Sequence, residues 1–253
     1  MAEHINLLWT GGWDSTLRLL QLLLIEKKRV QPHYIIIGTR KSTPNEIAAM
    51  DRIRKHLINK HPFVKNLLLE TQYISDSALN TDEEISEAYA TLKKQNHIGQ
   101  QYSSLANIAK QYEFTDFELC IESGEFANNF VIPFLYVNNS VQAPVYRISK
   151  TNTPNAVEQL FSYYTFPLVK LSKEEMIDYV KKQNWINIMN MTWLCHRPIL
   201  GRYPCGACNP CRFAILDGMS WRVPLPSRLI GGTVKKVFNS NPIVKCRNIL
   251  KKF

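Results

Sequence analysis

Four cysteines lie within a short segment of the last third of the chain, at spacings that are typical of metal ligands. Cys205, Cys208 and Cys211 follow one another as C-x-x-C-x-x-C, and Cys195 precedes them by ten residues. Zinc binds four thiolates tetrahedrally in structural sites, and a glycine after the first cysteine of a knuckle lets backbone N–H groups face sulfur. A 4Fe–4S cluster can use the same closely spaced thiolates, and His196 could replace Cys195. The nearby fourth cysteine favours a closed site, so we predict that these four cysteines bind Zn²⁺.

A glycine-rich loop near the N-terminus, residues 10–16, is the second group of residues that could do chemistry. It lies between an apolar run and a leucine-rich segment, which predict a strand and a helix. Glycines let backbone N–H groups approach an anion, and the N-terminus of a helix adds partial positive charge. Hydroxyl groups in the loop add donors, and Asp14 can hold Mg²⁺ against phosphates or order the loop. The loop therefore predicts a phosphate site formed by Thr10, Gly11, Gly12, Trp13, Asp14, Ser15 and Thr16.

Both groups need a scaffold of strands and helices that brings them to defined places. Short apolar runs predict buried strands at residues 5–9, 34–37, 66–74 and 117–121. Helices are predicted at residues 15–26, 81–95, 101–112 and 172–184, and from Thr43 onward; those from Thr43, Thr81 and Ser172 open with a capping-box pattern. Strands that alternate with helices favour the α/β class with a doubly wound, mostly parallel sheet. We predict a ligand-binding α/β domain at residues 1–165 and a small helical metal-binding region with a basic tail at 166–253.

Composition and charge narrow the class of protein. The 253 residues are 45% hydrophobic and 21% charged, which is typical of a globular protein and excludes a disordered chain. No apolar run is long enough to span a membrane and no signal peptide is recognisable, so we expect a cytoplasmic protein without a membrane partner. The net charge of +10 fits a nucleic acid, a nucleotide or another anionic partner. The segment from Arg222 to the end has eight basic residues and no acidic one, which fits either such a partner or a solvated tail.

The glycine-rich loop resembles the S-G-G-x-D-S loop of the PP-loop ATP pyrophosphatases, with Thr10 in the place of the usual serine. The exchange keeps the hydroxyl group. The resemblance implies an adenine nucleotide alpha hydrolase-like fold with ATP and Mg²⁺ as cofactors. It also implies cleavage of ATP between the α and β phosphates, with an acyl adenylate as intermediate and Asp14 and Ser15 as catalytic residues.

The cysteine segment narrows the resemblance from the PP-loop enzymes in general to one family. Residues 192–195, T-W-L-C, and 204–212, P-C-G-A-C-N-P-C-R, are similar to the zinc segment of the 7-cyano-7-deazaguanine synthase family. Weaker similarities spread over most of residues 5–215 and imply that Arg40, Gly99 and Gln100 also bind ATP. The resemblance implies a homodimeric carbon–nitrogen ligase that adenylates the carboxylate of a small deazapurine, 7-carboxy-7-deazaguanine, for attack by ammonia or another amine. The zinc would then be structural.

The chain departs from that family in one segment. Where the family has S-G-Y-P-D-C-R, residues 122–128 read E-S-G-E-F-A-N, so Glu122, Gly124 and Glu125 are the candidates for substrate binding. The departure favours a divergent paralogue, such as one in bacterial antiphage defence that attaches a deazaguanine to a protein amine. A PP-loop sulfur or nitrogen transferase that modifies tRNA is a second alternative. A non-catalytic zinc-ribbon module is disfavoured by the intact loop.

Overall fold

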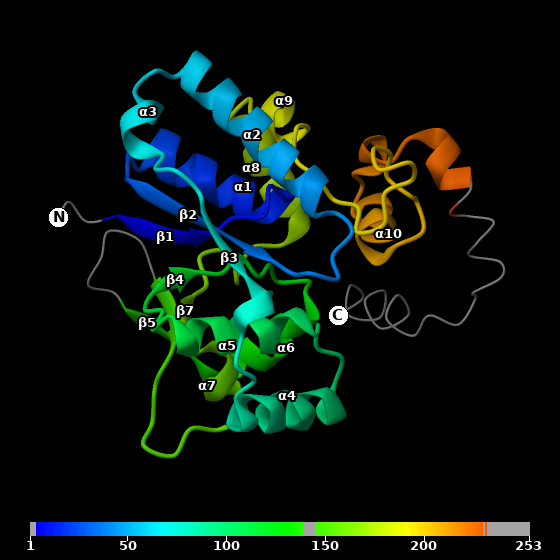
Figure 1. Ribbon diagram of the computed structural model, residues 1–253. Helices are drawn as coiled ribbons and strands as arrows, with labels where there is room; N and C mark the ends of the chain where they lie inside the picture. Colours follow the sequence, from blue (N-terminus) through cyan, green and yellow to red (C-terminus); the bar gives the residue numbers. More distant parts are fainter. Residues whose placement is uncertain (1–3, 139–144, 230, 232–253) are drawn as a thin grey trace.

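A mixed, mostly parallel β-sheet forms the centre of the molecule (Figure 1). The computed structural model describes residues 4–138, 145–229 and 231. Seven described strands pair in the order β3 (Gln72–Ser75), β2 (Val30–Ile36), β1 (Ile5–Leu8), β4 (Phe117–Glu118), β7 (Tyr164–Thr165), β6 (Val145–Ile148) and β5 (Leu135–Asn138). The first five are parallel, and β6 and β5 add an antiparallel edge.

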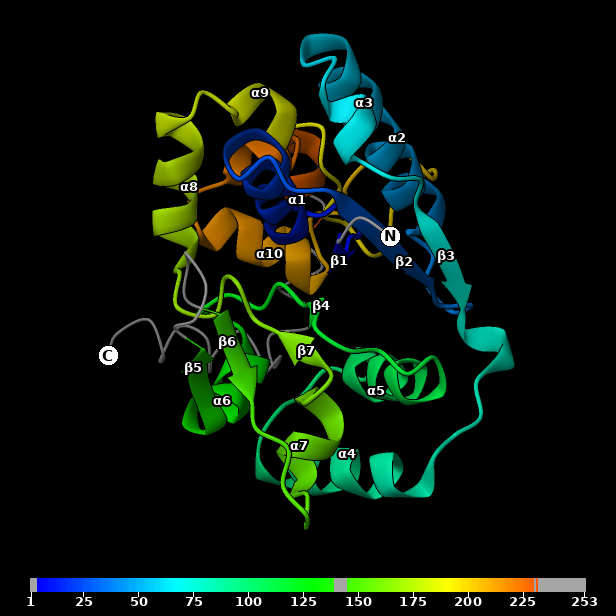
Figure 2. The ribbon, with the colours of Figure 1, turned by 90° about the vertical axis from the view of Figure 1, so that its left-hand side faces the viewer.

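Helices cover both faces of this sheet (Figures 1 and 2). One face carries α1 (Trp13–Leu20), which continues as a π-helical turn, Gln21–Ile25, together with α2 (Thr43–Lys60), α3 (Val64–Leu67), α8 (Lys173–Lys182) and α9 (Ile186–Met189). The other face carries α4 (Glu83–Gln95), α5 (Gln101–Gln111), α6 (Phe126–Val131) and α7 (Ala156–Phe161). The cysteine segment and α10 (Asn209–Leu216) lie beside the first layer. The predicted fold class, a doubly wound and mostly parallel sheet with a small helical cysteine-containing region, is confirmed.

Strand β1 shows why the sheet is buried on both sides. Successive side chains of a strand point to opposite faces. Leu7 belongs to the apolar cluster under α1, α2 and α8, whereas Leu8 belongs to the cluster under α5, α6 and α7. The first cluster also contains Met176, Cys195 and Cys211, so residues beyond 165 share the core of the N-terminal residues. The predicted division of the chain at residue 165 stays a prediction.

The start of α2 differs from its prediction. Thr43 was expected to cap this helix with Glu46 completing a capping box, but Ser42 is the N-cap residue and makes no side-chain cap. The Glu46 carboxylate is buried instead. It accepts hydrogen bonds from Tyr34 Oη at 2.8 Å and from Arg40 Nη1 at 3.2 Å. The hydroxyl of Ser42 also donates to this carboxylate, and Tyr34 belongs to β2, so side chains rather than the backbone of the first turn hold Glu46.

Other boundaries shift for similar reasons. Asp82, not Thr81, caps α4 by accepting from the Ile85 N–H. The strand predicted at 66–74 is replaced by the end of α3 and by β3, and the strand predicted at 117–121 ends at residue 118. The capping box of α8 is confirmed, because Ser172 and Glu175 bond each other's backbone N–H groups.

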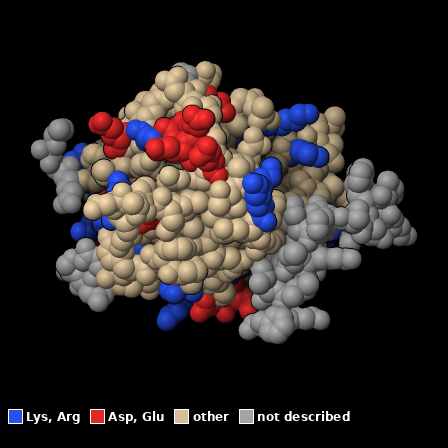
Figure 3. Space-filling model, turned by 90° about the horizontal axis from the view of Figure 1, so that it is seen from below, with Lys and Arg blue, Asp and Glu red and all other residues tan. Residues whose placement is uncertain are grey.

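Charge and membrane features can be compared with the sequence for the described residues. In the face seen from below, Lys and Arg side chains lie in small separate groups, some of them beside acidic groups (Figure 3). Most of the basic segment that starts at Arg222 lies outside the described residues. Within the described ranges, every helix is too short or too polar to cross a membrane.

Candidate functional site

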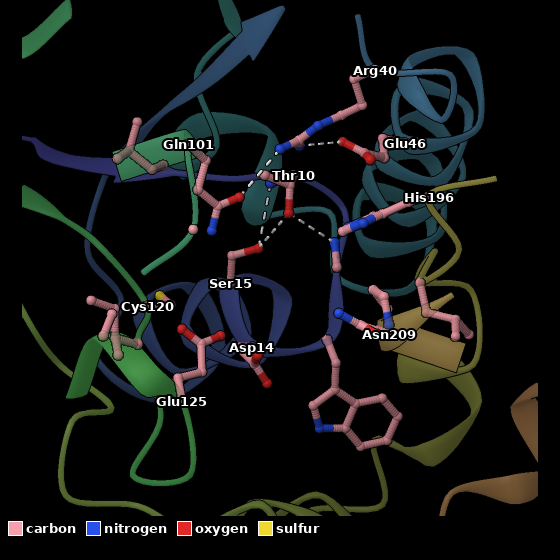
Figure 4. Close-up of a pocket in the computed structure, with 18 of the residues that line it drawn as sticks. Thr10, Asp14, Ser15, Arg40, Glu46, Gln101, Cys120, Glu125, His196 and Asn209 are labelled. Atoms are coloured by element: carbon pink, nitrogen blue, oxygen red, sulfur yellow. Dashed lines mark hydrogen bonds and ion pairs between the residues drawn. The ribbon is translucent and has the colours of Figure 1, made fainter. Parts of the chain in front are cut away.

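The glycine loop sits between the end of β1 and the start of α1. Gly11 has a φ of +64°, a conformation that costs other residues energy, and an added Cβ would lie 2.9 Å from the Glu46 carbonyl oxygen. The loop is further ordered by its hydroxyl groups: Ser15 Oγ accepts from the Thr10 N–H at 3.4 Å, and Thr10 Oγ1 accepts from the Gly12 N–H at 3.4 Å (Figure 4). Backbone and hydroxyl donors therefore gather at the N-terminus of a helix, as an anion site requires.

A cavity of about 1370 Å³ opens in front of this loop. It lies past the carboxyl ends of β1, β2 and β4, where the chain turns to opposite sides of β1, and doubly wound sheets bind ligands at this switch point. The N-termini of α1, α5 and α10 also face it, which favours a negatively charged ligand. The predicted site residues that line the cavity are Thr10, Gly12, Trp13, Asp14, Ser15, Arg40, Gly99, Gln100, Glu122 and Glu125.

Three of the predicted ATP- and substrate-binding residues lie outside the cavity lining. Gly11 forms the backbone turn described above, and Thr16 is fully buried, where its Oγ1 accepts from Trp9 Nε1 at 3.0 Å. Gly124 donates its N–H to Glu122 Oε2 at 2.7 Å. These residues shape the loops around the cavity, while their neighbours face it.

Lys173 joins the site from the first position of α8. Its Nζ forms an ion pair with Asp14 Oδ1, so that Asp14 is held by a partner from a distant segment. Burial disfavours the charged ammonium group of Lys173, but the charges of Asp14 and Glu122 outweigh it and raise its pKa. A lysine in the first turn of a helix opposes the helix dipole. That unfavourable placement was the signal in the sequence that could have identified it.

Glu125 faces the same space from the N-cap position of α6 (Figure 4). Its Oε2 accepts a hydrogen bond from Tyr102 Oη at 3.0 Å. Burial and the negative charges of Asp14 and Glu122 raise the pKa of Glu125 to about 7. The site thus contains a carboxyl group that can gain or lose a proton near neutral pH.

Arg40 is positioned at the rim of the cavity by two residues. Its Nη1 donates to Glu46 Oε2 at 3.2 Å and its Nη2 donates to Gln101 Oε1 at 3.3 Å (Figure 4). Gln101 is the first residue of α5, next to the predicted ATP residues Gly99 and Gln100. The structure therefore brings together Arg40 and the segment of Gly99 and Gln100, which the sequence separately predicts to bind ATP.

The four predicted metal ligands meet at one point. Their sulfur atoms all lie within 4.8 Å of one another. Cys208 Sγ is 3.8 Å from Cys195 Sγ and 3.5 Å from Cys211 Sγ, and Cys205 Sγ accepts N–H groups from Ala207 at 3.4 Å and Cys208 at 3.3 Å. Tetrahedral zinc with bonds of about 2.3 Å separates its sulfur ligands by roughly 3.8 Å. The cluster is therefore suited to a single metal ion.

The cysteine segment is tied directly to the glycine loop. Trp193 donates its backbone N–H to the Gly11 carbonyl at 2.9 Å, and its Nε1 donates to the Cys195 carbonyl at 2.7 Å. One residue thus spans the metal ligands and the loop. This residue joins the cysteine cluster to the loop that borders the cavity.

Arg222 is a candidate site residue that the sequence alone predicts only as the start of the basic tail. Its Nη2 donates to the carbonyl of Thr192 at 3.2 Å and to the hydroxyl of Thr192 at 2.6 Å. The guanidinium lies 5.0 Å from the centre of the Trp13 ring and lines the cavity. Burial lowers its pKa to about 10, against the opposing effect of Asp14. No local motif marks this arginine, because its surroundings come from segments far away in the sequence.

Comparisons with known proteins give little further information. No protein-family model matches the chain, and no curated protein matches it. Among solved structures, the chain is similar to the U34-tRNA thiolase NcsA from Methanococcus maripaludis with its 4Fe–4S cluster, at 12% sequence identity. The match covers 93% of this chain and 72% of that one, with a TM-score of 0.38.

Proposed function

We propose that this chain is an ATP-dependent ligase of the 7-cyano-7-deazaguanine synthase type. It adenylates the carboxylate of 7-carboxy-7-deazaguanine and passes the acyl group to an amine. The observation that carries the proposal is the glycine loop, whose residues Thr10, Gly12, Asp14 and Ser15 line a large cavity at the switch point of the sheet. The resemblance of this loop and of the cysteine segment to that family names the reaction.

Several cationic groups support the binding of ATP phosphates at the loop. Arg40 and Arg222 line the cavity from two sides, and Lys173 lies next to Asp14. Arginine binds phosphate oxygens through paired N–H donors, and such charge-assisted hydrogen bonds are stronger than neutral ones. Mg²⁺ accompanies ATP and supplies further charge neutralisation at the phosphates when it is bound. We propose that these groups hold the α phosphate beside the substrate.

The reaction proceeds in two steps. A carboxylate oxygen of the substrate attacks the α phosphorus, the bond to the β-phosphate oxygen breaks, and pyrophosphate leaves. The amine nitrogen then attacks the carbonyl carbon, the bond to the phosphate oxygen breaks, and AMP leaves with that electron pair. Lys173 and Arg222 would stabilise the negative charge that develops on the α phosphate in the first step.

The size and lining of the cavity agree with two substrates. Its volume of about 1370 Å³ exceeds the roughly 300–1,000 Å³ of a typical small-molecule site. On the side of the cysteine segment it is lined by Leu194, Phe213 and Met219, which could contact a flat heterocycle. We propose that the deazapurine lies there. The metal would be zinc in a structural position, because four thiolates leave no open coordination site.

The proposal is tested by the release of AMP and pyrophosphate. Purified protein is incubated with ATP, Mg²⁺ and 7-carboxy-7-deazaguanine, with and without ammonia, and both products are measured. We expect release that depends on the deazapurine, and its loss in Asp14→Ala with the fold intact. Asp178→Ala is the matched control, because Asp178 is an exposed carboxylate on α8. The absence of deazapurine-dependent AMP from folded wild-type protein would refute the proposal.

Further experiments distinguish among tRNA modification, transfer to a protein amine and transfer to ammonia. AMP release that requires tRNA instead of the deazapurine would identify a tRNA-modifying enzyme. A deazaguanine adduct on a co-expressed protein, detected by mass spectrometry, would identify a protein amine as the acceptor. Efficient conversion of the free deazapurine with ammonia alone would instead make ammonia the nucleophile.

A further inference from the structure

We propose that Glu125 is the general base that takes a proton from the amine when the amine attacks the acyl adenylate. This inference rests on the proposed function and assigns a separate residue to its second step.

Glu125 has the position that such a base needs. It lines the cavity at the start of α6, and its carboxylate and that of Asp14 extend into the same space (Figure 4). One oxygen, Oε2, is held by the hydroxyl of Tyr102, a residue of α5 that is itself buried. In the part of the chain that the structure describes, Tyr102 is the one side chain that donates to this carboxylate. A fixed carboxylate that faces the same cavity as the glycine loop is pre-organised for proton transfer with a ligand bound there.

The charged groups around Glu125 come from three elements. Asp14 on α1 and Glu122 in the preceding loop are negative, and Lys173 on α8 is positive. The thiol of Cys120 also lies close enough to interact with it. Burial acts together with the two carboxylates, and the pKa of Glu125 rises to about 7 despite Lys173. The group can therefore be ionised at neutral pH and still bind a proton.

The second step of the reaction uses a group that can accept a proton at neutral pH. An amine attacks through its lone pair, and the nitrogen must lose a proton as the bond to the carbonyl carbon forms. The free carboxylate of Glu125 accepts that proton while AMP leaves with the electrons of the broken carbon–oxygen bond. A base whose pKa lies near the working pH is the most effective one, and such catalysis is worth about 10²- to 10⁴-fold.

The first arm of the test separates the two steps in Glu125→Gln. Exchange of labelled pyrophosphate into ATP that depends on 7-carboxy-7-deazaguanine measures the first step. Formation of the amide from ammonia measures the whole reaction. We expect amide formation to fall at least about 100-fold more than exchange. Hydroxylamine, a stronger nucleophile that is largely uncharged at neutral pH, should restore much of the loss as hydroxamate. Glu83→Gln, an exposed carboxylate at the start of α4, is the matched control.

The second arm uses the pH profile of amide formation. Wild-type protein should show an inflection near pH 7 that Glu125→Gln lacks. Tyr102→Phe removes a hydrogen bond that favours the ionised carboxylate, so its inflection should move to higher pH. An equal loss of exchange and amide formation in Glu125→Gln, or amide formation that is unchanged, would overturn the role of Glu125. Wild-type protein without exchange would instead overturn the proposed function.

Discussion

Gly11 and Gly12 are adjacent, but the structure predicts that a substitution by alanine will have different consequences at the two positions. Gly11 has a φ of +64°, and an added Cβ would lie 2.9 Å from a backbone oxygen of α2 and 3.0 Å from Met50 Cγ. Gly12 has a φ of −79°, and among the described residues its Cβ would meet only Thr10 Oγ1 at 3.1 Å and Trp193 O at 3.8 Å. Gly11→Ala should therefore impair folding, whereas Gly12→Ala should impair ligand binding.

The magnitudes follow from these contacts. The left-handed conformation costs Ala about 1–2 kcal/mol at position 11, and overpacking against fixed backbone adds about 1–3 kcal/mol. A loss of about 2–5 kcal/mol is a large part of the roughly 5–15 kcal/mol that stabilises a typical domain. At position 12 the reduced freedom of the unfolded chain offsets part of the crowding, so we expect a change within about 1 kcal/mol. The added methyl group would nevertheless stand beside the loop donors and weaken ATP binding at least about tenfold, which is about 1.4 kcal/mol.

Two measurements on each variant check this prediction. Urea unfolding gives the free energy of unfolding, and titration calorimetry gives the affinity for ATP. A Gly11→Ala protein as stable as wild type would refute the strain assigned to this turn. A Gly12→Ala protein that binds ATP as wild type does would show that the nucleotide phosphates do not lie on this loop.

Three further predictions concern the groups around the loop. Cys205→Ser should lose metal and folded protein together, because metal binding and folding are coupled; elemental analysis of wild type should give one zinc per chain, and iron would contradict the zinc assignment. Arg222→Met should reduce the pyrophosphate exchange that depends on 7-carboxy-7-deazaguanine about 10- to 100-fold, which corresponds to the loss of one hydrogen bond to a charged group. Arg202 is exposed, so Arg202→Met should leave this exchange unchanged. Equal rates in the two variants would exclude Arg222 from the site. Folding raises the pKa of Glu125 from 4.5 to about 7, so its contribution to stability is fully present below about pH 4.5 and is lost as the pH rises through about 7. Glu125→Gln should therefore gain up to about 3 kcal/mol of stability relative to wild type between pH 4 and pH 8, and parallel pH profiles of urea unfolding would contradict this.

The features that could be predicted from the sequence are those that local residues determine. The strand–glycine–helix pattern at residues 5–26 predicts a loop at the end of a strand, and the loop is found there. Ser172 and Glu175 lie three residues apart and cap each other, so their helix start was also predictable. The same holds for Cys205, Cys208 and Cys211, because the chain turns locally at Gly206, whose φ is +69°, while Cys195 joins them from ten residues upstream.

The charged groups of the site could not be predicted in this way. The partner of Lys173 is Asp14, 159 residues away in the sequence, and Arg222 is held by Thr192 from another segment. Whether a charged side chain is solvated or buried depends on what packs against it, and that is decided by the assembled sheet. Glu46 illustrates the same limit, since a pattern that predicted a helix cap gave a buried hydrogen-bond acceptor instead.

The hydrogen bond from Trp193 to Gly11 also has a consequence for synthesis on the ribosome. The glycine loop is translated before the residue that bonds its carbonyl, which follows more than 180 positions later. At about 5–20 residues per second, the loop waits for roughly 10–40 s before this partner is made. Lys173, which forms the ion pair with Asp14 of the loop, is also made long after the loop. A nascent chain that already contains the complete loop therefore lacks these two contacts, and competence to bind the proposed nucleotide should arise only after Lys173 and Trp193 have been made.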